Sequence, residues 1–183
     1  MRRFFAGIKI PEHLGEKLME VGTLLAPQVP AKRWYGVEHF HITTNFLGEL
    51  DEGGLTQAIG SLEEVVPRHQ CFQLSLQGAG SFPRARVIWI GAGGETEKLF
   101  ALQYELRQAF RPLGAEKFAY AKFTPHITLA RTGDISTFDA ESIPVGSILD
   151  DSTWRVEQVC LFESVMDPAG ARYPIVHQVP LKD

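Results

Sequence analysis

The sequence predicts an α+β fold whose sheets are mostly antiparallel. Apolar, strand-like runs are mixed with amphipathic helical patterns, but the two do not alternate in the strict order that builds a parallel sheet. The chain has 183 residues, of which 44% are hydrophobic and 22% charged, as in ordinary globular proteins. No linker or low-complexity stretch divides it, so we expect a single domain over residues 1–183.

Hydrophobic periodicity predicts each element in turn. Leu14, Leu18, Val21 and Leu25 recur at helical spacing, and other apolar runs alternate as strands do. Asp51 stands where it could cap the second helix. The expected elements are a strand over 3–10, a helix over 11–25, a strand over 39–46, a helix through 55–66, strands over 71–77 and 86–92, a helix over 95–113, and strands over 120–130, 155–163 and 174–180.

Composition and charge limit the possible functions. The net charge of −4 argues against a protein that coats a nucleic-acid duplex, although a local basic pocket could hold one phosphate or a strand end. No run approaches the roughly 20 apolar residues of a membrane span. Lys9 interrupts the first apolar run, which is therefore a strand rather than a signal peptide. Cys71 and Cys160 lie in apolar runs and indicate buried thiols, so we expect a cytoplasmic protein.

Two strand-like runs carry the same triplet, His-Ile-Thr. They are HITTNFLGEL at residues 41–50 and FTPHITLAR at residues 123–131. Because side chains alternate along a strand, each His shares one polar face with the Thr two positions on. The first polar face is expected to hold His39, His41, Thr43 and Asn45, opposite Phe40, Ile42, Thr44 and Phe46. The second is expected to hold Tyr120, Lys122, Thr124, His126 and Thr128, opposite Phe123, Ile127 and Leu129.

Two facing H-x-T pairs would suit a displacement at phosphorus. Imidazole gives or takes a proton near neutral pH, and a threonine hydroxyl can donate a hydrogen bond to an oxyanion. One neutral His would activate a water while the other, protonated, supplies the leaving oxygen with a proton. This chemistry needs no metal. A single triplet carries little information, and both histidines could be ordinary strand residues.

The two runs resemble the signature motifs of the 2H phosphoesterase superfamily, and most of all those of its RNA 2′,3′-cyclic phosphodiesterases, long called 2′-5′ RNA ligases. RRFFAGIKIP at the start resembles the opening strand of that family. GSFPRARVIWIG, residues 80–91, resembles its central hairpin, and ESVMDPAGARYPIVHQVPL its last strands. The resemblance therefore spans nearly the whole chain.

The resemblance implies a bilobal fold in which two mostly antiparallel sheets with flanking helices are related by a pseudo-two-fold axis, with the active-site cleft between the lobes. It implies hydrolysis of a terminal 2′,3′-cyclic phosphate on RNA to a 2′-phosphomonoester. His41 would be the proton donor, His126 the proton acceptor, and Thr43, Thr128 and Arg131 the phosphate-binding residues. Strict alternation puts Arg131 on the wrong face, so the strand must bulge or end near Ala130.

Several alternatives stay open. His39 and His41 form an H-x-H pair, but no further ligand stands at a matching spacing, so we expect no metal and no other cofactor. Trp34, Tyr173 and Arg33 are candidate contacts to a base or to RNA. The substrate could be RNA ends or a small cyclic-phosphate nucleotide, and the same site could run in reverse as a 2′-5′ ligase without ATP. A non-catalytic RNA-binding or nucleotide-binding module is a further possibility. No obligate protein partner is expected.

Overall fold

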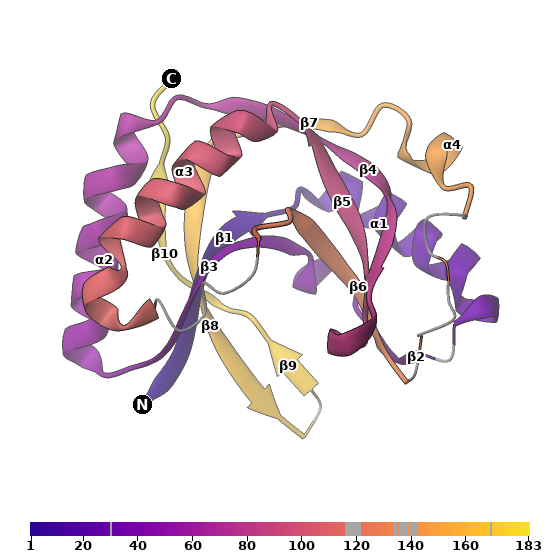
Figure 1. The fold of residues 1–183 in the computed structure, drawn as a ribbon, viewed down its shortest axis with the longest axis horizontal. Coiled ribbons are helices and arrows are strands. Elements are labelled where there is room, and N and C mark those ends of the chain that lie inside the picture. Colours follow the sequence, from indigo (N-terminus) through magenta and orange to yellow (C-terminus); the bar gives the residue numbers. More distant parts are fainter. Residues whose placement is uncertain (30, 116–121, 134, 136–138, 140–142, 169) are drawn as a thin grey trace.

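The structure is a computed structural model that describes residues 1–29, 31–115, 122–133, 135, 139, 143–168 and 170–183. Its strands form one hydrogen-bonded network in the order β10-β8-β1-β3-β6-β5-β4-β7, with β2 beside β6 and β9 beside β8 (Figure 1). Every pairing between these strands is antiparallel, which confirms the predicted α+β class. The strands are β1 (Arg2–Lys9), β2 (Ala31–Trp34), β3 (His41–Leu50), β4 (Phe72–Phe82), β5 (Val87–Gly94), β6 (His126–Thr132), β7 (Thr153–Val156), β8 (Gln158–Asp167), β9 (Gly170–Arg172) and β10 (Ile175–Pro180).

The two expected sheets are two halves of this network, joined at one point. We call β10, β8, β1 and β3 the β1 half, and β6, β5, β4 and β7 the β5 half. The halves meet between β3 and β6, where Ile42 and Ile127 form the single registered pair among the described residues. Within each half the neighbouring strands pair over four or more residues, as β1 and β3 do along most of their length.

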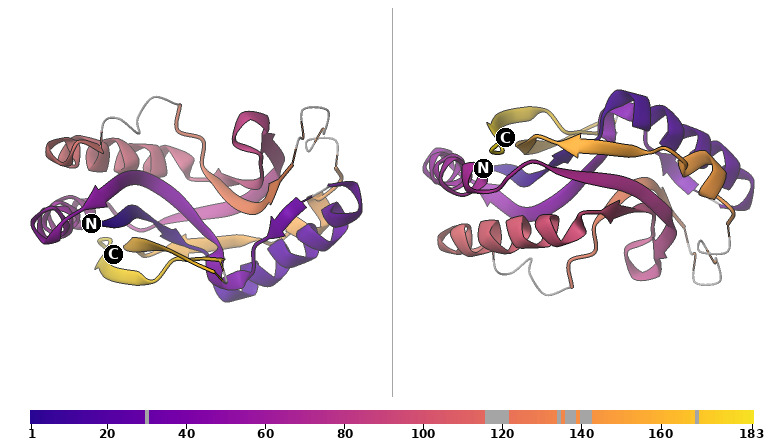
Figure 2. Two further views of the ribbon diagram at one scale, coloured as in Figure 1. Left: turned by 90° about the horizontal axis from the view of Figure 1, so that it is seen from below. Right: turned by 90° about the horizontal axis from the view of Figure 1, so that it is seen from above.

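Helices cover the two halves on opposite sides. Helices α2 (Glu52–Val65) and α3 (Thr96–Ala109) lie on the β1 half, whereas α1 (Glu12–Leu25) and the short α4 (Gly146–Leu149) lie on the β5 half (Figure 1). In Figure 2, α3 is on one side of the strands at one end of the molecule, and α1 is on the other side at the opposite end. This arrangement agrees with the pseudo-two-fold relation that the resemblance implied.

The helices bury the residues that their periodicity predicted. Leu14, Leu18, Val21 and Leu25 of α1 are fully buried, as are Leu99, Leu102 and Leu106 of α3. Helix α3 ends at Ala109, earlier than expected, and a 3-10 turn follows over Arg111–Leu113. Pro112 accounts for the early end, since it has no N–H to continue the helical ladder.

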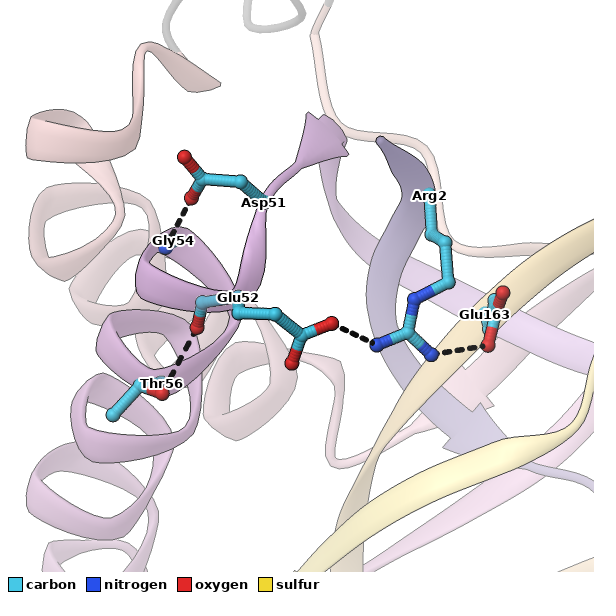
Figure 3. A network of polar contacts seen from close by, with 6 residues as sticks. All are labelled: Arg2, Asp51, Glu52, Gly54, Thr56 and Glu163. Atoms are coloured by element: carbon cyan, nitrogen blue, oxygen red, sulfur yellow. Dashed lines mark hydrogen bonds and ion pairs between the residues drawn. The ribbon is translucent and has the colours of Figure 1, made fainter.

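The N-terminus of α2 is fixed by side chains from three elements (Figure 3). The Asp51 Oδ1 accepts a hydrogen bond of 2.8 Å from the Gly54 N–H, which confirms the predicted cap. Arg2 of β1 joins this helix to β8, because its guanidinium donates to Glu52 at 3.0 Å and to Glu163 at 3.2 Å. Thr56 donates to the Glu52 carbonyl at 2.9 Å.

The segment before β3 differs from the prediction. β3 begins at His41, and His39 ends a 3-10 turn over Val37–His39 rather than lying on the strand. The expectation that His39 shares a strand face with His41 is therefore wrong. The short strands β2, β7 and β9 were also not predicted, and β4, β5 and β8 run beyond their expected ends.

The second H-x-T strand is shorter than expected. β6 begins at His126, so Lys122 and Thr124 precede the strand instead of lying on it. Pro125 directly before it has no N–H with which to extend the ladder. Tyr120, the first residue of the expected strand, lies outside the described residues.

The core and the helix lengths bear on two further expectations. Cys160 is buried, but Cys71 is only half-buried, and both are free thiols. The longest helices among the described residues have 14 residues, too few to cross a bilayer.

Candidate active site

The two H-x-T strands meet at the junction between the halves. Ile42 of β3 pairs with Ile127 of β6, and both are fully buried. His41 and Thr43 flank the first isoleucine, and His126 and Thr128 flank the second. The antiparallel direction therefore sets His41 beside Thr128 and Thr43 beside His126, and all four side chains are half-buried. We call the sheet face that carries these four side chains the histidine face.

Both imidazoles are held in the same way by their own chain. The Nδ1 of His41 lies 2.6 Å from the carbonyl oxygen of His39, and the Nδ1 of His126 lies 2.7 Å from that of Thr124. A carbonyl oxygen only accepts hydrogen bonds, so each Nδ1 carries the proton and donates. In the neutral ring each Nε2 is therefore left with a lone pair, and it becomes a donor when the ring is protonated.

Aromatic rings surround His41 in the β1 half. Its ring centre lies 4.7 Å from that of Phe5, 5.4 Å from Phe162 and 5.0 Å from Tyr173. Phe5 and Phe162 stack at 4.9 Å and are each 3% exposed, so they form a small second core beside the histidine. Phe5 therefore belongs to a buried cluster and is not open to a stacking partner from solvent.

His126 has its own aromatic support in the β5 half. The Phe82 ring meets it edge-on at 4.9 Å, and the Trp89 ring centre lies 6.1 Å away. The indole of Trp89 lies against Gly80 on the neighbouring strand, where an added Cβ would come within 2.2 Å of the ring. Gly80 is thus required by the close approach of this indole.

Burial makes both histidines weaker bases than usual. It lowers the pKa of His41 to about 4, although the hydrogen bond to the His39 carbonyl acts in the opposite direction and nearby His126 lowers it further. Burial also lowers the pKa of His126, partly offset by its hydrogen bond to Thr124. Both rings are therefore mainly neutral at pH 7. An anion bound between them would raise both pKa values.

Arg131 reaches the histidine face through a bulge. Trp89 of β5 pairs with Thr128 and Ile88 pairs with Ala130, so Leu129 is an extra residue on β6. The bulge predicted near Ala130 is thereby confirmed, and Arg131, paired with Val87, is exposed on the same side as Thr128. Without the extra residue its side chain would point to the opposite face.

Arg33 and Tyr173 lie close to one another, near Arg131. Arg33 pairs with Arg131 across β2 and β6, and its guanidinium lies 5.6 Å above the ring of Tyr35. Burial raises the pKa of Tyr173 to about 12, as does its hydrogen bond with Tyr35, whereas the positive charges of Arg131 and Arg33 act to lower it. Of the three candidate RNA contacts, Tyr173 thus lies against His41, and Arg33 lies near Tyr173 and Arg131.

Trp34, the third candidate contact, is placed elsewhere. It pairs with buried Ala130, packs against the main core and lies over Gly22 of α1, where an added Cβ would be 3.3 Å from the indole. Its neighbour Arg33 takes the opposite side of β2, as expected from alternation.

His39 supports the site through hydrogen bonds and does not act with His41 as a pair of metal ligands. Its Nε2 lies 3.0 Å from the Ala171 carbonyl of β9, and its Nδ1 lies 3.3 Å from the Gly36 N–H. The backbone carbonyl of His39 is the group that fixes His41. Within the described ranges, no three His, Cys, Asp or Glu side chains are grouped so that they could hold a metal ion.

Sequence reasoning did not identify Phe82, Trp89 or Phe162 as neighbours of the histidines, since each depends on cross-strand pairing.

The expectation that Asn45 shares the polar face of His41 is wrong, because Thr44 is an extra residue of β3 between the pairs Gly7–Thr43 and Ala6–Asn45. Asn45 therefore turns toward the helices, and its amide donates to the Gln103 carbonyl of α3 at 3.4 Å.

Comparisons with known proteins agree with this architecture. The family model of the 2′-5′ RNA ligase superfamily matches residues 22–167. A protein of Escherichia coli strain K12 named RNA 2′,3′-cyclic phosphodiesterase is 31% identical over 94% of this chain and 92% of its own. One of the same name from Aeropyrum pernix is 30% identical over 78% of this chain and 82% of its own.

A solved structure gives the same result for the fold. The crystal structure of the protein TT0787 of Thermus thermophilus matches with a TM-score of 0.82 and 28% sequence identity, over 98% of both chains. The matched family region contains both H-x-T strands and the junction between the halves. The chain belongs to the 2′-5′ RNA ligase superfamily, the group of 2H phosphoesterases that its two H-x-T strands resemble.

Proposed function

We propose that this chain hydrolyses the 2′,3′-cyclic phosphate at the end of an RNA and leaves a 2′-phosphate. The observation that carries the proposal is that His41 and His126 flank the single residue pair that joins the two halves. Each imidazole has its Nδ1 hydrogen-bonded to a backbone carbonyl oxygen, which leaves its Nε2 available. The relatives named RNA 2′,3′-cyclic phosphodiesterase support the same substrate class.

The reaction uses one neutral and one protonated imidazole. The Nε2 of neutral His126 accepts a proton from water, whose oxygen attacks phosphorus in line with the bond to the 3′ oxygen. As that bond breaks, the Nε2 of protonated His41 donates its proton to the leaving 3′ oxygen. The assignment of donor and acceptor follows the family resemblance, because both rings are held in the same tautomer.

The negative charge of the substrate supplies the required protonation state. A cyclic phosphodiester carries one negative charge, and between the two imidazoles it favours protonation of one ring, because a second proton would be repelled by the first. The hydroxyls of Thr43 and Thr128 and the guanidinium of Arg131 hold the non-bridging oxygens as charge builds on them. Tyr173 and Arg33 stand near this group and are the proposed contacts to the rest of the nucleotide.

No metal, nucleotide cofactor or protein partner takes part in this scheme. Since each half supplies one H-x-T pair, residues 1–183 act together as one bilobal domain. Attack of a 5′ hydroxyl in place of water would form a 2′-5′ bond and break the same bond from phosphorus to the 3′ oxygen, so ligation would use the same residues without ATP.

The test is a short RNA with a 2′,3′-cyclic phosphate end, incubated with the protein in EDTA. The native protein should release a 2′-phosphate product, and His41→Ala and His126→Ala should each lower kcat by roughly 10²- to 10⁴-fold. Bound RNA without product would instead indicate a binding module. Turnover of only a cyclic mononucleotide would indicate another cyclic-phosphate substrate, and turnover abolished by EDTA would contradict the metal-free scheme.

A further inference from the structure

His39 is held through both nitrogens of its ring. Its Nε2 lies 3.0 Å from the carbonyl oxygen of Ala171 on β9, and because a carbonyl only accepts, this nitrogen carries the proton and donates. Its Nδ1 then accepts from the Gly36 N–H at 3.3 Å. The ring is thus held as the Nε2–H tautomer, the opposite of the Nδ1–H tautomer of His41.

The same residue closes the turn that precedes β3. The His39 N–H donates to the Gly36 carbonyl at 2.9 Å, so the backbone and side chain of His39 together bind both polar groups of Gly36. The Phe40 N–H donates to the Val37 carbonyl at 3.3 Å. The His39 carbonyl and the Phe40 N–H belong to one planar peptide group, so the closed turn fixes the direction of this carbonyl.

That carbonyl is the acceptor that holds His41. Its oxygen lies 2.6 Å from the His41 Nδ1, and this bond sets both the tautomer and the rotation of the imidazole. A rotation of the His39 peptide group would move the acceptor and, with it, the Nε2 at the opposite edge of the His41 ring. The aim of the proposed proton donor therefore depends on the turn that His39 closes.

The place of the His39 ring depends on both halves of the molecule. Its centre lies 5.2 Å from that of Tyr35 and 6.0 Å from that of Tyr173. Tyr35 is tied to β6, because its N–H donates to the Leu129 carbonyl at 2.9 Å, whereas Tyr173 follows β9, which pairs with β8. The His39 side chain is only 11% exposed. Packing from both halves therefore keeps the ring in place for its two hydrogen bonds.

Glu38 is a second neighbour of the His39 Nδ1 and supplies the control. Its carboxylate lies 3.0 Å from this nitrogen and is 73% exposed. A carboxylate and a ring nitrogen with a lone pair are both acceptors, so the neutral ring bonds to Gly36 instead. Glu38→Ala removes a side chain from the same turn and leaves the bonds of His39 to Gly36 and Ala171.

We propose that His39 is a positioning residue for the proton donor of the reaction. Its ring, bonded to Gly36 and Ala171, fixes the turn whose carbonyl holds the His41 imidazole as the Nδ1–H tautomer with Nε2 toward the phosphate. His39 acts through His41 and does not touch the substrate. The inference rests on the proposed function for the role of His41 as proton donor.

The first measurement is kcat and KM for hydrolysis of a short RNA with a 2′,3′-cyclic phosphate end. His39→Ala should lower kcat roughly 10- to 100-fold with little change in KM, because it misaligns a group that acts in the transition state. His39→Asn should recover most of this loss, since its side-chain oxygen can accept from the Gly36 N–H. Glu38→Ala should behave as native protein. A change in KM alone, or equal losses in His39→Ala and His39→Asn, would overturn the assignment.

The second measurement reads the tautomer of His41 without turnover, by nitrogen-15 NMR at pH 7, where both rings of the site are mainly neutral. In native protein His41 and His126 should both be Nδ1–H tautomers. His39→Ala should convert His41 to a mixture of tautomers. His126, which is fixed by the Thr124 carbonyl, is the internal reference and should not change. An unchanged His41 tautomer, or an equal change at His126, would refute the positioning role.

The two measurements separate this inference from the proposed function. Absence of hydrolysis by native protein would refute the proposed function, and the His41 tautomer would then decide the inference by itself. His39→Phe serves where His39→Ala does not fold, because it keeps a ring between Tyr35 and Tyr173 without the hydrogen bonds. It should show the same loss of kcat and the same tautomer mixture, and a native His41 tautomer in this variant would contradict the proposal.

Discussion

Replacing His41 by Asn should remove part of the pH dependence of folding stability. Burial lowers the pKa of His41 from 6.5 to about 4 in the folded protein, so between these values the unfolded chain binds a proton that the folded chain does not. The stability contribution is therefore complete above pH 6.5, falls as pH drops toward 4, and changes no further below that. Asn is the chosen substitution because its amide can replace Nδ1–H as donor to the His39 carbonyl.

The expected magnitude follows from the two pKa values. Between pH 7 and pH 5 this one group should lower the free energy of unfolding by about 2 kcal/mol. Urea unfolding at both pH values, followed by the fluorescence of the three tryptophans, gives the free energies for native protein and for His41→Asn. The loss on going to pH 5 should be about 2 kcal/mol smaller in the variant.

Comparing the loss of unfolding free energy from pH 7 to pH 5 between native protein and His41→Asn removes effects that do not depend on pH. Any packing cost of the substitution is present at both pH values and cancels, as does the titration of retained residues that do not interact with His41. Equal losses in the two proteins, within about 0.5 kcal/mol, would refute the argument that burial beside Phe5, Phe162 and Tyr173 suppresses protonation of His41. An NMR titration of the His41 ring gives its pKa directly.

Three other predictions follow from the same structure. The optimum of kcat/KM should lie at lower pH than that of kcat, because kcat/KM reports the free enzyme, in which burial lowers the pKa of both His41 and His126, whereas the bound phosphodiester raises them; coincident pH profiles would contradict this. Gly80→Ala should cost about 1–3 kcal/mol in urea unfolding and alter the Trp89 fluorescence, since the new Cβ would lie 2.2 Å from the indole; a wild-type midpoint and emission would show that the indole moves freely. Asp51→Ala should cost about 1 kcal/mol through loss of the bond to Gly54, and Asp51→Ser should recover most of it in the same assay.

Local sequence patterns predicted the features that depend on one segment alone. The burial of Leu14, Leu18 and Val21 follows from helical spacing, and the cap at Asp51 follows from its place before a helix. The polar faces of the two H-x-T triplets also follow from alternation over three residues. In each of these cases the relevant neighbours are within about one turn or one strand of the residue itself.

The features that were missed depend on a partner strand. The extra residue Thr44 on β3 shows only in the register with β1, and it decides that Phe46, rather than Asn45, shares the side of His41. The bulge at Leu129 was expected only because the resemblance required Arg131 near the phosphate. Cross-strand neighbours such as Phe82 and Trp89 have no signature in the segment that contains His126.

The single pair between Ile42 and Ile127 has a mechanical consequence. A longer ladder between β3 and β6 would fix the angle between the halves by many hydrogen bonds, and one pair acts more like a pivot. The gap between the two Nε2 atoms then depends also on the hydrophobic core that both halves share and that includes residues of α1 and α3. Core substitutions in α1 or α3 should accordingly change turnover, although these helices do not contact the site.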